Sequence, residues 1–146
     1  MRVDRPESWL ALHGFLVAFV WEMLQMPFYS MDGLSIWRIT VNCTIASVGD
    51  AGIMVIAYAV ASVVAKNRYW LHNRAALPLA TYLGTGQVIT IAVEFWALRS
   101  NWGWRYAEKM PELFGIGVVP LLMWIVVPLV ALALAARSSK KLRAEK

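Results

Sequence analysis

Cysteine and histidine are nearly absent from this chain of 146 residues. The single cysteine, Cys43, excludes an internal disulfide and a cysteine-rich metal site, and it says little about the redox compartment. The two histidines, His13 in the first apolar segment and His72 in a connection, are expected at different depths, which argues against a histidine-based metal site. The chain also lacks CxxC and HExxH motifs, a glycine-rich phosphate loop and a serine nucleophile elbow. We therefore expect neither a metal nor an organic cofactor.

Charged side chains are scarce as well, because they make up 16% of the chain against 60% hydrophobic residues. A soluble domain of this length has too little interior to bury so much apolar surface. The net charge of +5 comes from lysines and arginines in short segments between apolar runs and near the C-terminus. That distribution is typical of contact with anionic lipid head groups, and it argues against a nucleic-acid partner.

Four apolar segments are long enough to cross the hydrocarbon core of a bilayer, which takes roughly 20 helical residues. They cover residues 8–29, 37–65, 77–98 and 116–136. No segment alternates polar and apolar residues with the period of a strand, so we predict helices. The sequence thus predicts one transmembrane domain over 1–146, an all-α integral membrane four-helix bundle with a basic tail at 137–146. In the last helix, Pro120 could open the helix and Pro128 should kink it.

The distribution of lysine and arginine sets the expected orientation. Ten of the fourteen lie before the first apolar segment, between the second and third segments, or in the tail. By the positive-inside rule, both termini and the second connection face the cytoplasm. Arg2 and Arg5 precede an apolar stretch, as in a signal peptide, but no small-residue cleavage site follows. We therefore expect the first helix to be retained.

Three acidic residues fall inside the apolar segments: Glu22, Asp50 and Glu94. An acid near the middle of a transmembrane helix costs roughly 2.5–3.5 kcal/mol on insertion scales, so it usually faces a partner or a polar interior. At helical spacing, each acid belongs to a stripe on one helix face. The stripes are Gly14, Ala18, Glu22, Gln25 and Tyr29; then Cys43, Ser47, Asp50, Met54 and Tyr58; then Gln87, Thr90 and Glu94. We predict one polar interior shared by three helices.

The predicted topology brings these acids together in the outer half of the membrane, next to the connection 99–115. The aromatic residues of that connection are either interfacial anchors or part of an ordered cap, such as a half-helix lying on the membrane. We take Glu22, Asp50 and Glu94 as the candidate catalytic residues. The candidate substrate-binding residues are Trp21, Gln25, Tyr29, Arg38, Asn42, Gln87, Trp104, Arg105 and Tyr106.

Each acid also has a purely structural interpretation. Glu22 with Gln25, or Asp50 with Ser47, could form ordinary hydrogen bonds worth about 1 kcal/mol each. Glu94 could form an ion pair with one of three arginines: Arg38, Arg99 or Arg105. Under this interpretation the acids would be consumed by their partners and would not form a site.

Several sequence features resemble a set of small bacterial inner-membrane proteins. They are WEMLQMPFY at 21–29, GD at 49–50, Glu94, and WRYAEKMPELFGIGVVPLLMW at 104–124. This likeness spans most of the chain. It implies a four-helix protein in the bacterial cytoplasmic membrane, and it brings no activity with it.

A shorter stretch looks like one half of the integral-membrane terpene cyclases. A Trp-Glu pair, Trp21 and Glu22, is followed by aromatic residues, and Asp50 stands on the next helix. The resemblance implies that Glu22 and Asp50 match intramembrane acids that are thought to protonate an isoprenoid epoxide or alkene. Those enzymes have more helices than this chain, so the resemblance also implies that two copies would be required to close such a site.

Three classes of function remain open. The first is a membrane enzyme that isomerises or cyclises a lipid or isoprenoid, with Glu22 as general acid and Asp50 or Glu94 as base. The second is a non-catalytic accessory or assembly subunit of a membrane complex. The third is a proton-coupled carrier that uses the acids as a relay. The expected partners are membrane lipid, an apolar isoprenoid-like ligand, and a second copy or a larger membrane complex.

Overall fold

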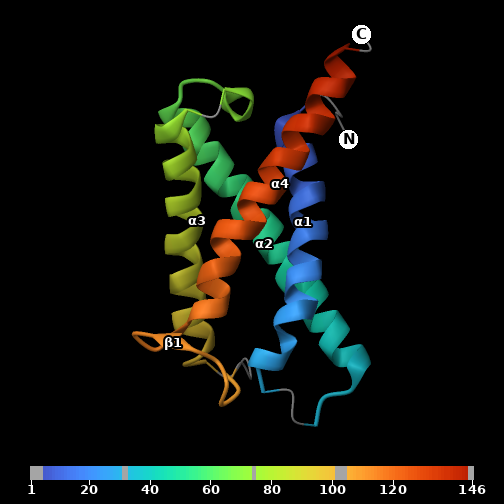
Figure 1. Ribbon diagram of the computed structural model, residues 1–146, viewed down its shortest axis with the longest axis vertical. Coiled ribbons are helices and arrows are strands. Elements are labelled where there is room, and N and C mark those ends of the chain that lie inside the picture. Colours follow the sequence, from blue (N-terminus) through green and yellow to red (C-terminus); the bar gives the residue numbers. More distant parts are fainter. Residues whose placement is uncertain (1–4, 31–32, 74, 101–104, 145–146) are drawn as a thin grey trace.

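The protein consists of four long helices connected by short segments (Figure 1). The computed structural model describes residues 5–30, 33–73, 75–100 and 105–144, with side chains described as far as residue 140. The helices are α1 (Pro6–Gln25), α2 (Ile36–Val64), α3 (Ala76–Ala97) and α4 (Val118–Ala144). The prediction of an all-α chain with four long apolar helices is confirmed for the part of the chain that is described.

The ends of the helices follow from the local sequence. Pro6 opens α1, where its fixed φ and missing N–H suit the first turn. A short 3-10 helix, η1 (Met26–Phe28), extends α1 by one turn. α2 begins behind Ser35, whose hydroxyl accepts a hydrogen bond from the backbone N–H of Arg38. Residues 137–144, which were predicted as a basic tail, continue α4 as helix.

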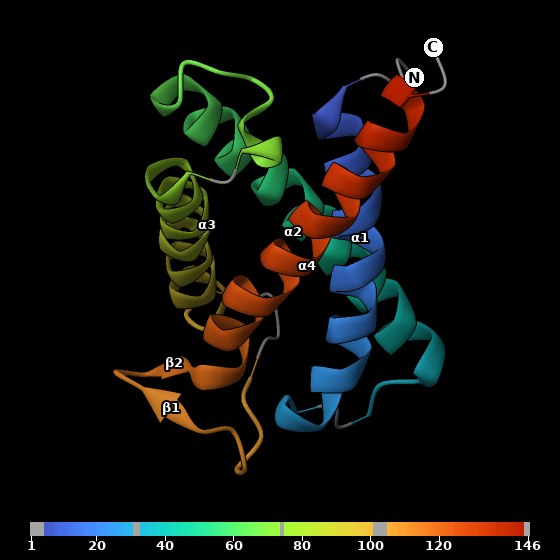
Figure 2. The same ribbon diagram turned by 45° about the horizontal axis from the view of Figure 1, so that its top comes forward.

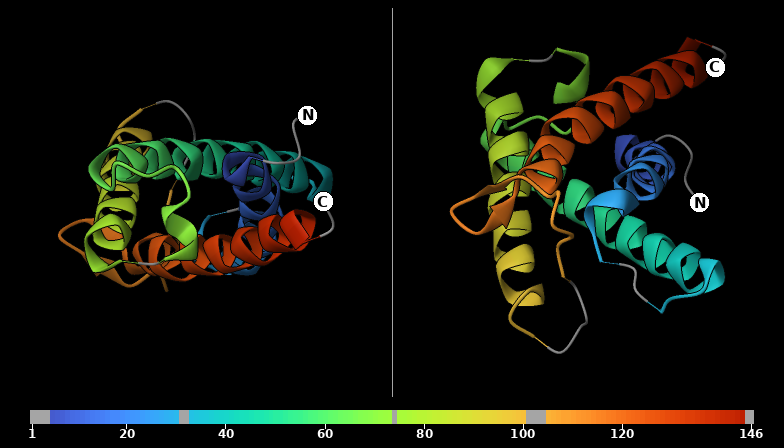
Figure 3. Two further views of the ribbon diagram at one scale, coloured as in Figure 1. Left: turned by 90° about the horizontal axis from the view of Figure 1, so that it is seen from above. Right: turned by 60° about the horizontal axis from the view of Figure 1, so that its bottom comes forward.

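Viewed along the length of the bundle, α2 and α4 run along its two long sides, with α3 at one end and α1 toward the other (Figure 3). Both α1 and α3 pack against α2 and α4. α2 and α4 run obliquely, in opposite diagonal directions, between α3 and α1 (Figures 1 and 2). Both ends of the described chain lie at one end of the bundle, which we call the terminal end; the opposite end is the hairpin end.

The terminal half of the bundle is filled by aromatic and small side chains. Tyr58 stacks on Trp70, and the Trp70 ring also meets Tyr82, with ring centroids 5.2 and 5.9 Å apart. Trp70 belongs to a second short 3-10 helix, η2 (Trp70–His72), in the connection between α2 and α3. Alanines allow the helices to approach closely here. The fully buried ones are Ala57, Ala61, Ala131 and Ala135.

The outer surface of the bundle is apolar on every helix. Large hydrophobic side chains are exposed on each of them, for example Leu16 on α1, Val63 on α2, Val88 on α3 and Val130 on α4. Each helix is long and apolar enough to cross a membrane. An apolar surface that surrounds the whole molecule is unfavourable in water and suits a lipid environment.

The connection between α3 and α4 is extended over its described part, 105–117. An isolated β-bridge joins Tyr106 to Tyr29, just after the end of η1. Two short antiparallel strands follow, β1 (Glu112–Leu113) and β2 (Ile116–Gly117). They form a hairpin beside the first turn of α4 (Figure 2). This connection therefore ties the start of α4 to the end of the first helix.

The turn of this hairpin consists of Phe114 and Gly115, with φ of 52° and 76°. Two successive positive φ values are what a tight two-residue hairpin turn requires. The backbone hydrogen bonds of this segment join two antiparallel strands and do not form helical turns. The expected half-helix is therefore wrong for the described part. Trp102 and Trp104 lie outside the described residues, so the expectation of interfacial anchors there stays a prediction.

Candidate functional site

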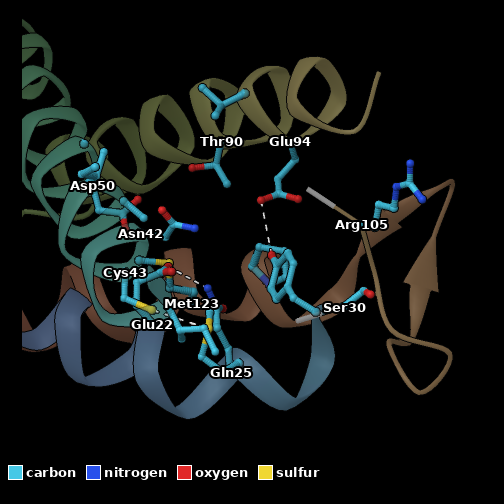
Figure 4. A pocket seen from close by; sticks show the side chains of 18 of the residues that line it. Glu22, Gln25, Ser30, Asn42, Cys43, Asp50, Thr90, Glu94, Arg105 and Met123 are labelled. Atoms are coloured by element: carbon cyan, nitrogen blue, oxygen red, sulfur yellow. Dashed lines mark hydrogen bonds between the residues drawn. The ribbon is translucent and has the colours of Figure 1, made fainter. Parts of the chain in front are cut away.

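A pocket of about 760 Å³ lies in the hairpin half of the bundle, between α1, α2, α3 and the start of α4 (Figure 4). Small-molecule sites usually occupy about 300–1,000 Å³. The polar residues that line it are Glu22, Gln25, Tyr29, Ser30, Arg38, Asn42, Asp50, Thr90, Glu94 and Arg105. The remaining lining residues are apolar or small: Met26, Leu34, Ile39, Cys43, Ile45, Ala46, Gly49, Ile53, Val93, Pro120, Met123 and Trp124.

The structure brings the three candidate acids to this one pocket, although each comes from a different helix. Glu22 is on α1, Asp50 on α2 and Glu94 on α3, and Figure 4 shows them around one open space. Glu22 and Glu94 are buried. Asp50 is partly exposed as a residue, but its Oδ2 atom is inaccessible to solvent. The three acidic residues of the apolar segments therefore all line this one pocket.

The candidate binding residues divide into three groups. Five of them line the pocket: Gln25, Tyr29, Arg38, Asn42 and Arg105. Three do not line it, namely Trp21, Gln87 and Tyr106, although Trp21 and Tyr106 form hydrogen bonds to residues that do. The Gln87 amide turns toward α4 and donates to the Leu121 carbonyl at 3.3 Å. Trp104 lies outside the described residues.

Glu22 is held by a chain of hydrogen bonds along α1. The Trp21 indole N–H donates to Gln25 Oε1 at 3.0 Å, and Gln25 Nε2 donates to Glu22 Oε1 at 2.6 Å. Because an indole N–H can only donate, it fixes which end of the Gln25 amide faces Glu22. Glu22 Oε2 takes no hydrogen bond within the described part of the chain. That oxygen is the one left to hold a proton or meet a ligand.

Glu94 is held by two tyrosines from the hairpin end. The Tyr106 hydroxyl donates to Glu94 Oε2 at 2.6 Å, and the Tyr29 hydroxyl lies 3.4 Å from Oε1. Tyr106 Oη also accepts the backbone N–H of Gly117 at 2.9 Å. Burial, followed by the hydrogen bond to Glu94, raises the pKa of Tyr106 above its ordinary value, so the phenol stays a donor. Glu94 thereby joins α3 to both the end of α1 and the hairpin connection.

The ion pairs considered for Glu94 do not form among the described residues. There, the only ion pair joins Arg68 to Glu7 at the terminal end, 2.7 Å apart. Arg99 instead donates to the Phe95 carbonyl, and its guanidinium lies over the Phe95 ring. Tyrosine hydroxyls bind the Glu94 oxygens instead, with Tyr106 coming from the hairpin connection and Tyr29 from the end of η1.

Asp50 differs from both glutamates. Its Oδ2 atom is buried and has no hydrogen-bond partner within the described residues. The hydrogen bond considered with Ser47 does not form, since the Ser47 hydroxyl donates to the Cys43 carbonyl at 2.6 Å. A buried acceptor without a partner costs roughly 1–3 kcal/mol, so such an atom is a place where a ligand or water would bind.

The remaining histidine and sulfur groups do not assemble a metal site. Within the described part of the chain, no three His, Cys, Asp or Glu side chains are arranged to hold a metal ion. His13 turns away from the pocket, with Nε2 2.9 Å from Ser138 Oγ on α4. Cys43 is buried, and its Sγ lies 3.5 Å from Met26 Sδ. Both sulfurs line the pocket as part of its apolar wall.

The pocket opens along the side of the bundle. The lining residues that are exposed mark this opening: Arg38, Asn42, Ile45 and Gly49 on α2, and Arg105 in the hairpin connection. Ile45 and Gly49 lie well inside the apolar span of α2. An apolar molecule could therefore enter from the side of the bundle, whereas the two arginines stand where the opening approaches the hairpin end.

Sequence reasoning missed the contribution of α4 to this site. Pro120, Met123 and Trp124 close the pocket from that side, with Trp124 only 1% exposed. Helix four carries no acid within its apolar span, so no polar stripe pointed to it. Gly86 was the available signal, because a glycine one turn from Thr90 on the α3 stripe permits a large side chain from a neighbouring helix.

Comparison with known proteins gave no relative, since no family model, no curated protein and no solved structure matches this chain. The proposed function therefore rests on the geometry of the site.

Proposed function

We propose that this chain is a multi-pass protein of the bacterial cytoplasmic membrane, with cytoplasmic termini, that isomerises or cyclises a lipid or isoprenoid by acid–base chemistry. One observation carries the proposal: acids from three different helices line a single pocket that opens sideways at the level of the apolar spans. The membrane location rests on the apolar surface of all four helices, and the orientation rests on the distribution of lysine and arginine.

The proposed reaction needs only a proton donor and a proton acceptor. Glu22, through the unbonded Oε2, would donate its proton to a double bond or an oxygen of the ligand. After the carbon skeleton rearranges, the Asp50 carboxylate would remove a proton from a neighbouring carbon, which forms the new double bond. Nothing is oxidised or reduced, and one proton passing from Asp50 back to Glu22 restores the starting state.

The pocket wall suits a short-lived cation. Trp124 and Tyr29 line it, and the faces of aromatic rings attract positive charge by roughly 0.5–2 kcal/mol. The apolar side chains of α2, such as Ile39 and Ile53, exclude water that would otherwise trap the cation. Glu94 has a different role in this scheme, because two tyrosines engage its oxygens and it holds the hairpin connection in place.

The alternatives fit the geometry less well. In an accessory subunit the acids would be consumed by partners, yet Asp50 Oδ2 has none within the described residues. A carrier requires a path toward the terminal end, where Tyr58, Trp70 and Tyr82 fill the described interior. A pocket with an opening on one side fits an enzyme better than a carrier.

The test of this proposal is a screen for ligands that raise the melting temperature of the purified protein, using lipids and isoprenoids. We expect at least one compound to stabilise the wild type, and Glu22→Gln to bind it at least about tenfold more weakly, because a neutral amide forms a weaker hydrogen bond than an ionisable carboxyl group. Glu7→Gln is the matched control, since Glu7 is on the same helix but pairs with Arg68 at the terminal end. Equal responses of wild type and Glu22→Gln to every compound would refute the proposal.

The orientation predicts which exposed residues a membrane-impermeant maleimide reaches in intact cells. In a Cys43→Ser background, a cysteine at Glu108 should react from outside, whereas a cysteine at Ala75 should react only after permeabilisation. Both positions are exposed, and they lie in the connections at opposite ends of the bundle. Labelling of Ala75→Cys in intact cells would show that the termini are not cytoplasmic.

A further inference from the structure

The buried hydroxyl of Thr90 has no hydrogen-bond partner in the described part of the chain, unlike five other hydroxyls on these helices. Serine and threonine on apolar helices usually donate to the carbonyl four residues earlier. Among the described residues five do so, at 2.6–2.9 Å: Thr40, Thr44, Ser47, Ser62 and Thr81. Thr90 is only 6% exposed, lines the pocket, and its Oγ1 has no hydrogen-bond partner among the described residues.

Asp50 supplies a second unpartnered oxygen to the same pocket. Its Oδ2 atom is buried without a hydrogen bond in the described part of the chain, and α2 packs directly against α3, which carries Thr90. Figure 4 shows both side chains at the pocket, on the side where these two helices meet. A donor-acceptor hydroxyl and a carboxyl thus face the pocket unsatisfied, while the other two acids already have protein partners.

The chemistry of these two groups selects what would satisfy them. A hydrocarbon satisfies neither group. A hydroxyl can accept the proton of Thr90 Oγ1 and can donate its own to Asp50, so an alcohol is able to satisfy both kinds of group. The wall around them contributes no lysine or arginine from the depth of the pocket, since Arg38 and Arg105 stand at its exposed opening. The site therefore suits a neutral oxygen function better than a phosphate or a carboxylate.

We infer that Thr90 and Asp50 form a subsite for the hydroxyl group of an apolar alcohol, whose hydrocarbon body fills the apolar part of the pocket. This deepens the proposed function and rests on it, because it names the substrate class of the same site. The oxygen of the ligand lies between α2 and α3, and the chain extends along Ile45 and Ile53 toward the lateral opening. Thr90 is a binding residue in this arrangement and takes no part in proton transfer.

The experiment compares four ligands with purified wild type and three variants, using the ligand dependence of the melting temperature. The ligands are farnesol, farnesene, farnesyl methyl ether and dodecanol. Wild type should bind farnesol at least about fivefold more tightly than farnesene, the value of one net hydrogen bond. Thr90→Val should lower this preference, because only the hydrogen bond to Asp50 remains, while farnesene binding stays unchanged. Thr90→Ser, which keeps the hydroxyl, should retain it even where the valine variant folds poorly.

The control variant is Thr81→Val, which removes a hydroxyl from the same helix outside the pocket. It should leave the farnesol preference intact. The methyl ether accepts from Thr90 but cannot donate to Asp50, so its affinity should lie between those of the alcohol and the hydrocarbon. Dodecanol separates two sources of an alcohol: equal binding of dodecanol and farnesol supports a straight-chain ligand at the same subsite, and weaker binding supports an isoprenoid.

The subsite is overturned if wild type does not distinguish farnesol from farnesene. It is also overturned if Thr90→Val keeps the full preference for farnesol, as it would if a buried water lay between Thr90 and Asp50. Binding of no compound would overturn the subsite and the ligand-binding part of the proposed function together. Threonine-dependent binding without product leaves the subsite standing and removes the catalytic proposal. Turnover that is unchanged in Thr90→Val would support the catalytic proposal and refute the subsite.

Discussion

Replacing Asp50 with asparagine is expected to slow conversion of a bound isoprenoid by roughly a hundredfold to ten-thousandfold, the usual contribution of a general acid or base. Asparagine keeps the size of the side chain and its hydrogen-bonding capacity, but it cannot take up the proton that the rearranged ligand releases. The carboxyl oxygen Oδ2 is buried in the pocket, and no described residue forms a hydrogen bond with it. The rate is measured by mass spectrometry of the products under single-turnover conditions, with a ligand that stabilises the wild type.

Two other substitutions separate chemistry from folding in this experiment. Glu22→Gln should slow the reaction to a similar extent, because it removes the proton donor. Glu94→Gln should mainly lower stability, since the Glu94 carboxyl joins α3 to Tyr29 and Tyr106. If Asp50→Asn turns over at the rate of the wild type, Asp50 is not the base and the assignment of the acids is wrong.

Replacing Gly86 with alanine is expected to destabilise the protein by about 1–3 kcal/mol, the usual cost of overpacking a core. A Cβ atom on Gly86 would overlap the Trp124 ring, which is buried between α3 and α4. Since Trp124 also lines the pocket, the variant should bind ligand more weakly as well as melt at a lower temperature. Thermal and denaturant unfolding in one detergent measure the change.

Gly84→Ala is the matched control for this substitution. Gly84 is two residues away on the same helix, and no atom lies within 4 Å of the position its Cβ would take. Because alanine favours helix over glycine by about 1 kcal/mol, this variant should be neutral or slightly stabilised. Equal effects of the two substitutions would mean that helix propensity, and not contact with Trp124, decides the result.

The three acids of the pocket differ in their hydrogen-bond partners, and therefore in the chemistry that each can perform. As a set they suggest an acidic cluster, but their surroundings give each a different capacity. Glu94 is bound by two tyrosines, Glu22 is oriented through Gln25 with one oxygen left, and Asp50 Oδ2 is unpartnered in the described residues. Only Glu22 and Asp50 remain available to exchange protons with a ligand.

The pocket also alters what the likeness to larger membrane cyclases would require. That resemblance implied that two copies would be required to close such a site. Here the pocket is built within one chain, because α4 contributes Pro120, Met123 and Trp124 opposite the acids. A second copy or a larger complex is thus not needed to form the pocket.

The sequence by itself determined the four helices, their apolar exterior and the face on which each acid lies. These features depend on local quantities: the length of an apolar run, the helical period and the cost of a charge in lipid. The buried residues Gly14, Ala18, Glu22, Gln25 and Tyr29 follow the stripe that this period predicts.

Only the tertiary structure decided which groups meet. Tyr106 reaches Glu94 because the hairpin connection folds back over α3, and Trp124 closes the pocket because Gly86 leaves room for it. Thr90 Oγ1 and Asp50 Oδ2 have no hydrogen-bond partner among the described residues, although the helices that carry them pack against each other. Such contacts join residues far apart in the chain, and their geometry depends on how whole helices pack, which no periodic pattern within a single helix specifies.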